Sequence, residues 1–133
     1  MRKTYLLDVW VGDFESEARL NAYFDEKYDE DDAPISEFAA DMGVSFYDHD
    51  FLEFSFHQTP TDDVVVILKD HSGCDTEEVL SQAQSAFAVH KTPVNAAILV
   101  VNDERDLPQF ENPKSVSKPG ANLFYLGRFN TTL

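Results

Sequence analysis

Hydrophobic and polar residues alternate at the start of the chain, which predicts a β-strand over residues 4–11. One face of this strand carries Tyr5, Leu7, Val9 and Val11, and the other carries Leu6, Asp8 and Trp10. Gly12 is expected to end the strand. We expect the Trp10 indole to lie in the core rather than at an interface.

Two helices are expected after this strand. The first begins at an N-cap formed by Asp13 or Ser16. Its inner stripe has residues three and four apart, namely Leu20, Tyr23, Phe24, Lys27 and Tyr28. The second helix is shorter and follows Pro34, with Ser36 as its N-cap and Met42-Gly43 as its C-terminal stop.

The second half of the chain alternates between strand and helix patterns. Strands are predicted over residues 51–57, 96–101 and 123–129, and a helix over residues 75–90. The continuous apolar run at 96–101 is typical of a central strand that is covered on both faces. Residues 102–121 contain three prolines and a glycine, so we expect a long exposed loop there.

Residues 62–70 fit two structures. The β-branched run at 64–67 favours a strand, whereas Thr61, Asp62 and Asp63 resemble a helix start. We favour the strand. The predicted fold is then a single α+β domain over residues 1–133, with helices packed on a largely antiparallel β-sheet in the order β-α-α-β-(β)-α-β-β.

The composition of the chain limits the classes of molecule that it can bind. The chain has 133 residues, 43% of them hydrophobic and 17 of them aromatic, so it can form a sizeable core. Its formal charge is −15, which repels nucleic-acid phosphates and anionic membranes and attracts basic proteins. We therefore expect neither a nucleic acid nor a membrane as partner.

Cysteine content and the N-terminus point to a cytoplasmic protein. Cys74 is the only cysteine, so the chain cannot form an intramolecular disulfide. Asp8 interrupts the apolar stretch after Met1-Arg2-Lys3, and no small-residue cleavage site follows. No apolar run approaches the length of a membrane span. We expect a monomer.

The acidic residues are concentrated in one part of the chain. Net charge is −11 over residues 1–53, −5 over residues 54–90 and +1 over residues 91–133. The densest block contains Asp25, Glu26, Asp29, Glu30, Asp31 and Asp32. It lies at the predicted C-terminal end of the first helix, where the helix dipole disfavours acids. The block is either a solvated turn that aids solubility or a site selected for another purpose.

Aromatic residues are interleaved with these acids. Nine of the 17 aromatic residues lie between Tyr23 and Phe56. We assign Phe38, Phe54 and Phe56 to the core and expect Tyr28 and Tyr47 to be exposed. Protein interfaces use aromatic anchors within polar surroundings, so this pattern favours a binding face for a basic protein.

Motifs for catalysis or metal binding are weak. Asp48, His49 and Asp50 are adjacent on an extended segment, so they cannot easily converge on one ion even with His57 nearby. The acidic run lacks the spacing of an EF-hand loop. His71, Ser72 and Cys74 have no orienting third group, and we expect a turn there. No cofactor or metal is predicted.

Several segments resemble bacterial immunity protein family 22, which belongs to polymorphic toxin systems, including contact-dependent growth inhibition loci. The matching segments are 8–14 (DVWVGDF), 28–31 (YDED), 36–38 (SEF) and 46–53 (FYDHDFLE). The resemblance implies a cytoplasmic antitoxin that binds the toxic C-terminal domain of a cognate effector, often a nuclease with a basic cleft. It supplies no catalytic residues, because immunity proteins act stoichiometrically.

Together these lines predict an acidic surface that covers the substrate cleft of a basic nuclease toxin. The residues expected to contact the toxin are Asp25, Glu26, Tyr28, Asp29, Glu30, Asp31, Asp32, Tyr47, Asp48, Asp50 and Glu53. One alternative is an acidic nucleic-acid mimic that binds another basic protein. A second alternative is a small hydrolase that uses His49, His57 or Cys74.

Overall fold

The computed structural model describes residues 4–28, 33–71, 74, 76–90, 92–103 and 108–132. Within these residues the chain forms five strands, four α-helices and one short 3-10 helix. The strands are β1 (Thr4–Phe14), β2 (Leu52–Thr61), β3 (Val94–Asp103), β4 (Val116–Lys118) and β5 (Ala121–Thr132). The helices are α1 (Glu17–Tyr23), α2 (Glu37–Asp41), α3 (Val64–Leu68), α4 (Glu77–Phe87) and the 3-10 helix η1 (His49–Phe51).

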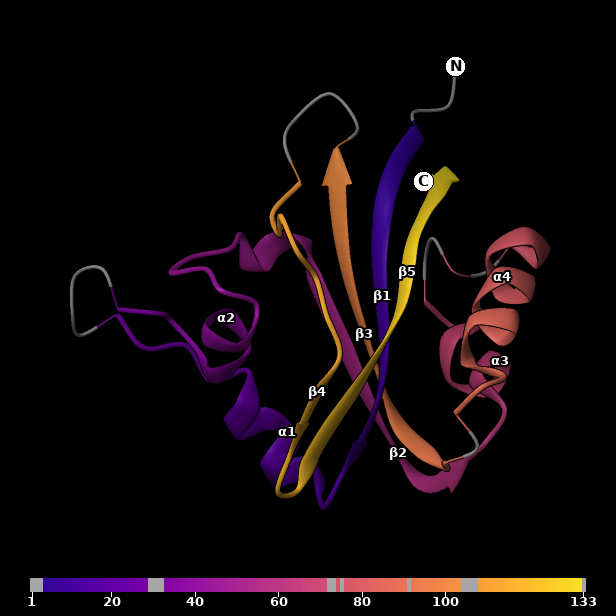
Figure 1. Cartoon of the computed structure of the whole chain (residues 1–133), viewed down its shortest axis with the longest axis horizontal. Coiled ribbons are helices and arrows are strands. Elements are labelled where there is room, and N and C mark those ends of the chain that lie inside the picture. The colour runs from indigo at the N-terminus through magenta and orange to yellow at the C-terminus, as the bar shows by residue number, and fades with distance from the viewer. Residues whose placement is uncertain are drawn as a thin grey trace.

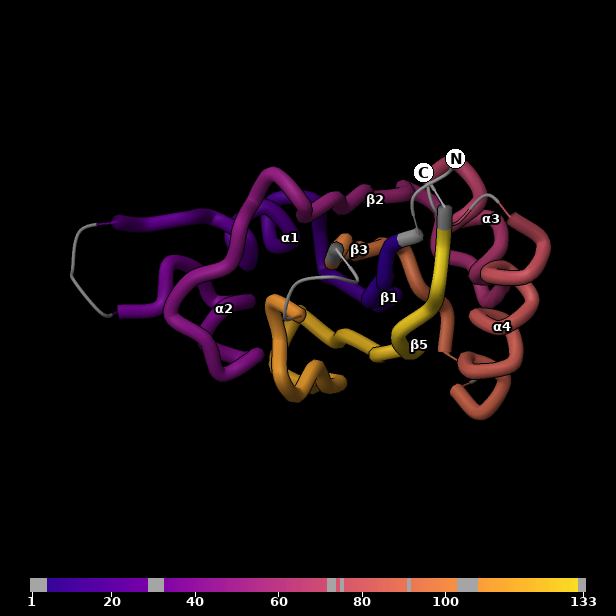
Figure 2. The backbone as a smooth tube through the Cα atoms, turned by 90° about the horizontal axis from the view of Figure 1, so that it is seen from above, coloured from indigo at the N-terminus to yellow at the C-terminus, as the bar shows by residue number. Residues whose placement is uncertain are grey.

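The strands form one antiparallel sheet in the order β2-β3-β1-β5-β4. The α1 and α2 helices lie on one side of this sheet and α3 and α4 on the other, as both views show (Figure 1, Figure 2). The predicted α+β fold is therefore confirmed. The β2 strand lies at one edge and follows directly after η1, so the predicted contact residues Asp48, Asp50 and Glu53 lie around the start of an edge strand.

The core beneath α1 and α2 is aromatic. Trp10 has no exposed surface, as expected, and its ring packs edge-on against Phe38 and Phe110. The Trp10 indole N–H also donates to the Lys114 carbonyl at 3.0 Å. The prediction of a long exposed loop over 102–121 was wrong for its described part, because Phe110 is fully buried and residues 116–118 form β4.

Gly12 does not end the first strand. The β1 strand continues to Phe14, and Gly12 pairs with Ala96 on one side and Leu123 on the other. A Cβ at Gly12 would lie 2.7 Å from the Phe14 ring and 3.0 Å from the Asn122 carbonyl oxygen. The glycine is therefore explained by this close approach and not by a turn.

The core beneath α3 and α4 is aliphatic. Leu7, Val9 and Val11 of β1 pack with the buried faces of both helices. The strand favoured for residues 62–70 was wrong, because Val64–Leu68 forms α3. Asp63 caps this helix by accepting from the Val65 N–H at 3.0 Å, and helical spacing buries Val64, Ile67 and Leu68.

The first helix is shorter than predicted. Ser16 caps α1, and the helix ends at Tyr23 with Phe24 as C-cap. The Lys27 N–H donates to the Ile35 carbonyl, so the backbone beyond Phe24 pairs with the returning chain instead of continuing the helix. Tyr28 is therefore 61% exposed and Lys27 is also exposed, not part of a buried stripe. The acidic block begins just after the helix, not within its last turn.

Candidate acidic and aromatic surface

Residues 46–51 form a turn that is held in place by one buried side chain. Tyr47 is only 2% exposed and packs against the Phe38 and Phe110 rings. Burial is the main reason that the pKa of Tyr47 rises to about 12. The prediction that Tyr47 is exposed was wrong, because its ring fills the space between α2 and the chain that precedes β4.

Two polar contacts fix the remainder of this turn. The Asp48 backbone N–H donates to Oε1 of Gln109, and the Asp48 carboxylate accepts from the Asp50 N–H at 3.0 Å. The second bond caps η1. Phe46 and Phe51 flank the turn and are 62% and 48% exposed. The turn therefore presents two aromatic rings beside Asp50 and His49, on a backbone that needs little ordering upon binding.

Glu26 connects the segment after α1 to this turn. Its carboxylate accepts a hydrogen bond from the Tyr28 hydroxyl and lies 3.3 Å from Nδ1 of His49. The hydrogen bond to Glu26 raises the pKa of Tyr28. His49 Nε2 in turn lies 3.3 Å from Oδ1 of Asp50. We call Glu26, Tyr28, Phe46 and residues 48–51 the acidic-aromatic surface.

The predicted contact residues divide into four groups. Glu26, Tyr28, Asp48 and Asp50 belong to the acidic-aromatic surface, while Asp25 is exposed next to Glu26. Tyr47 is the buried support of that surface. Asp29, Glu30, Asp31 and Asp32 lie outside the described residues. Glu53 faces the other side of the sheet, because its register partner Leu99 packs beneath α3 and α4.

Glu53 is the first of three polar side chains that are linked by hydrogen bonds. Its Oε1 lies 2.7 Å from Nδ1 of His71, and Nε2 of His71 lies 2.8 Å from the Ser55 hydroxyl oxygen. A carboxylate can only accept, so Nδ1 of a neutral His71 carries the proton and Nε2 accepts from Ser55. His71 is 7% exposed and ties the segment after α3 to β2.

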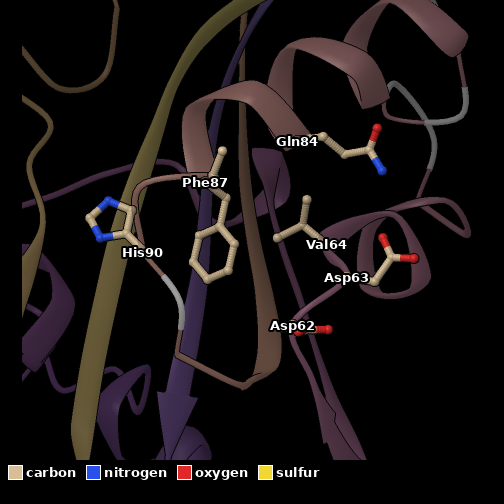
Figure 3. Close-up of a pocket in the computed structure, with 7 residues that line it drawn as sticks. Asp62, Asp63, Val64, Gln84, Phe87 and His90 are labelled. Carbon is tan, nitrogen blue, oxygen red and sulfur yellow. The ribbon is translucent and has the colours of Figure 1, made fainter.

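Asp50 and Glu53 meet at a small cavity despite facing different sides. Its volume is about 260 Å³, and its lining consists of Tyr5, Asp50, Phe51, Leu52, Glu53 and Val101. A larger cavity of about 500 Å³ lies between the start of α3 and the end of α4, with Val64 and Phe87 as its apolar floor (Figure 3). Asp62 and Asp63 line this larger cavity, and none of the predicted contact residues does.

Of the exposed aromatic residues on this surface, the sequence predicted only Tyr28. Phe46 and Phe51 were not among the predicted contacts, and Phe54, which we assigned to the core, is 36% exposed and stacks on Phe24. Phe38 is buried as expected, and Phe56 packs against the core. Two phenylalanines on either side of a tyrosine and three polar residues, over 46–51, were the signal that could have found the turn.

The residues considered for metal binding or catalysis include two neighbouring pairs, His49 with Asp50 in the turn at 46–51 and His71 with Cys74 after α3. Over the described residues, no group of three or more His, Cys, Asp or Glu side chains could hold a metal ion. Cys74 is buried, and its N–H donates to the His71 carbonyl. Ser72 lies outside the described residues. None of the helices that the structure describes is long and apolar enough to cross a membrane.

Comparison with known families gives one match. The model of the family named Immunity protein 22 matches residues 7–131 of the 133-residue chain. The chain belongs to the Immunity protein 22 family. Family membership supports an immunity, or antitoxin, role. No curated protein and no solved structure matches the chain.

Proposed function

We propose that this Immunity protein 22 member neutralises a cognate nuclease toxin by placing its acidic-aromatic surface over the basic substrate cleft of the toxin domain. The observation that carries the proposal is the turn at 46–51. Its backbone is fixed by Tyr47, Asp48 and Gln109, and it exposes Phe46 and Phe51. Bound in this way, the protein acts as a stoichiometric, monomeric inhibitor in the cytoplasm and needs no cofactor.

Charge explains how the partner would be found. The chain carries −15, and a basic cleft attracts such a surface from a distance. Opposite charges raise association rates to about 10⁸ M⁻¹s⁻¹ or above at low salt. Asp25, Glu26 and the acids at 29–32 supply this steering in the proposal. Rim charges of this kind affect the association rate more than the lifetime of the complex.

Aromatic rings explain how the complex would last. Interface energy is concentrated in a few central residues, and these are enriched in aromatic side chains. Phe46 and Phe51 lie on a turn whose backbone is held by hydrogen bonds, so little backbone entropy is lost when they are buried. An antitoxin that outcompetes substrate needs nanomolar affinity or better, which corresponds to about −12 kcal/mol.

Co-purification with the product of the adjacent upstream gene, followed by a growth-rescue assay, tests the proposal. Stopped-flow mixing then compares wild type with a variant in which residues 29–32 carry Asn or Gln. We expect slower association and a weaker salt dependence for this variant. The matched control is Asp62→Asn with Asp63→Asn on the other side of the sheet, since Asn still caps α3.

Each outcome of these measurements bears on a different part of the proposal. Unchanged kinetics for the 29–32 variant would remove that block from the mechanism. Absence of both binding and protection would overturn the antitoxin proposal for that partner. Binding to many basic proteins without protection would favour the alternative, a general nucleic-acid mimic.

A second candidate function is acyl transfer, and it is favoured by the hydrogen-bonded side chains of Ser55, His71 and Glu53. The three groups have the order of nucleophile, base and orienting carboxylate, at 2.8 and 2.7 Å. In such a step the Ser55 oxygen bonds to the acyl carbon of an activated ester while the bond from that carbon to the alcohol oxygen breaks. The hydroxyl proton passes to His71 Nε2 and from there to the departing alcohol, and water then cleaves the acyl group from Ser55.

A fluorophosphonate probe and mass spectrometry test this second function. We expect a single label on Ser55 that is absent from Ser55→Ala and slower in Glu53→Gln. A probe that labels Ser55 no faster than the exposed Ser117 would overturn it. We rank it second because family membership supports inhibition.

A further inference from the structure

The cavity of about 260 Å³ has an unusual combination of walls. It lies where the start of β1, the end of β3 and the start of β2 meet, and its aliphatic surface comes from Leu52 and Val101. Tyr5 and Phe51 add aromatic rings, while Asp50 and Glu53 add carboxylates. None of the six lining residues is basic.

We propose that this cavity receives one arginine side chain of the toxin, a proposal that rests on the proposed function. The two carboxylates give the cavity a negative charge that attracts a cation, and aromatic faces attract cations through their quadrupoles. The aliphatic surface suits the methylene stem of a long basic side chain. The charge and the mixed walls therefore match a cationic side chain and match neither an anion nor a purely apolar group.

The shape of the cation distinguishes arginine from lysine. A guanidinium is planar, so it stacks on an aromatic ring while its N–H groups bond carboxylates in the same plane. Phe51 is 48% exposed and lies directly between Leu52 and Asp50 in the chain. An arginine side chain can therefore contact the Phe51 ring and the carboxylates at the same time. An ammonium group would reach the charges without the stacking.

Glu53 is held in position for such a contact. Its Oε1 lies 2.7 Å from Nδ1 of His71, and His71 is itself bonded to Ser55. An ionised carboxylate has about four acceptor sites, so one bond to His71 leaves capacity for a guanidinium. The Glu53 side chain is 51% exposed, against 9% for His71. The buried imidazole therefore serves as a support for a carboxylate that solvent or a ligand can reach.

The cavity also extends the acidic-aromatic surface. Asp50 and Phe51 belong to both, because η1 forms the boundary between them. A toxin that covers the turn at 46–51 would therefore bring its own side chains to the cavity mouth. This continuity places the arginine at the edge of the same interface.

The experiment uses N-acetyl-arginine amide as probe and follows the amide signals of the full chain by NMR. We expect saturable shifts at Tyr5, Phe51 and Val101. N-acetyl-citrulline amide has nearly the same shape without charge and should bind at least tenfold more weakly. The variant Asp50→Asn with Glu53→Gln should also bind the arginine probe at least tenfold more weakly. Gln at 53 still accepts from His71, so the fold is retained.

Controls separate this cavity from general acidity. Asp62→Asn with Asp63→Asn removes two carboxylates at the other cavity and should leave probe binding unchanged. Equal binding of the arginine and citrulline probes would overturn the proposal. Equal binding of the probe to wild type and to the Asp50/Glu53 variant would also overturn it.

Toxin binding is measured separately with the same variants. If the wild-type protein binds the toxin tightly and the affinity of the Asp50/Glu53 variant for the toxin falls by less than twofold, the cavity proposal fails while the proposed function stands. If the probe binds as expected but the toxin neither binds nor is neutralised, the proposed function fails while the cavity remains a guanidinium site.

Discussion

The carboxylate of Asp8 accepts two hydrogen bonds from the guanidinium of Arg128, at 2.9 and 3.0 Å, although 120 residues separate them in the chain. The two residues are direct register partners on β1 and β5. Asp8 has no exposed surface and also accepts from the Tyr125 hydroxyl and from Asn102. The first residue of the motif at 8–14 is therefore structural, and its buried charge is fully paired.

Removal of this buried charge should destabilise the fold. For Asp8→Ala we expect the free energy of unfolding to fall by about 3–5 kcal/mol, because the Arg128 charge is left without its partner. Urea unfolding followed by circular dichroism measures the loss. Asp25→Ala, at an exposed position, is the control and should change stability by less than about 0.5 kcal/mol. A loss below about 1 kcal/mol for Asp8→Ala would contradict the assigned role.

Gly12→Ala should be destabilising within an otherwise regular strand. The added methyl group would lie 2.7 Å from the Phe14 ring and 3.0 Å from the Asn122 carbonyl oxygen, so one of them must shift. Overpacking of this kind costs about 1–3 kcal/mol. The matched control is Gly43→Asn, since a Cβ there meets no atom within 4 Å and Asn tolerates a left-handed backbone. Similar thermal midpoints for the two variants would refute this explanation of Gly12.

Elements with a strong periodic pattern could be predicted from the sequence, whereas elements decided by single contacts could not. The alternation at 4–11 and the apolar run at 96–101 each placed a strand correctly. At 62–70 the β-branched run favoured a strand over the helix that the preceding cap residues indicated. The structure shows the reverse, because the Asp63 side chain satisfies a helical N–H and the helix buries Val64 and Ile67.

Long-range packing explains the remaining errors in the fold and the site. Tyr47 looked like an exposed anchor because acids follow it, but its ring meets Phe110, 63 positions away by number. Phe110 itself lies in a proline-rich stretch whose composition indicated an exposed loop. A sequence pattern reports local preference and cannot show which distant ring fills a cavity. The acidic character of the surface was predictable, and its supporting aromatic contacts were not.

The ion pairs around Glu37 make stability depend on pH at the acid end. Bidentate hydrogen bonds from Arg19, at 2.9 and 3.0 Å, hold the pKa of Glu37 at about 2, against burial, and Lys118 also lowers it. A lowered folded-state pKa contributes stability that is present above the ordinary value near 4.5 and is lost as pH falls towards 2.

The Glu37 contribution should be modest, because the side chain is 34% exposed and solvent screens the pair. We expect Glu37→Gln to lower the free energy of unfolding by about 1 kcal/mol at pH 7. The fall of this free energy between pH 5 and 2 should then be less steep than in wild type. Unfolding midpoints in urea across this pH range provide the measurement. If the stability of the variant falls as steeply as that of wild type, other carboxylates account for the loss of stability at low pH.

The exposed aromatic residues of the turn should matter for toxin binding and not for folding. Phe51→Ala and Phe46→Ala are expected to weaken the complex by about 2 kcal/mol or more each, since central aromatic residues dominate interface energies. Their effect should lie in the dissociation rate, because no charge is removed. Val89→Ala is the matched control, as Val89 is 81% exposed two residues after the end of α4, on the other side of the sheet. Surface plasmon resonance gives both rates, and urea unfolding should show that all three variants keep wild-type stability within about 0.5 kcal/mol. Weakening by Val89→Ala with no effect of the two phenylalanine variants would move the interface to the α3 and α4 side.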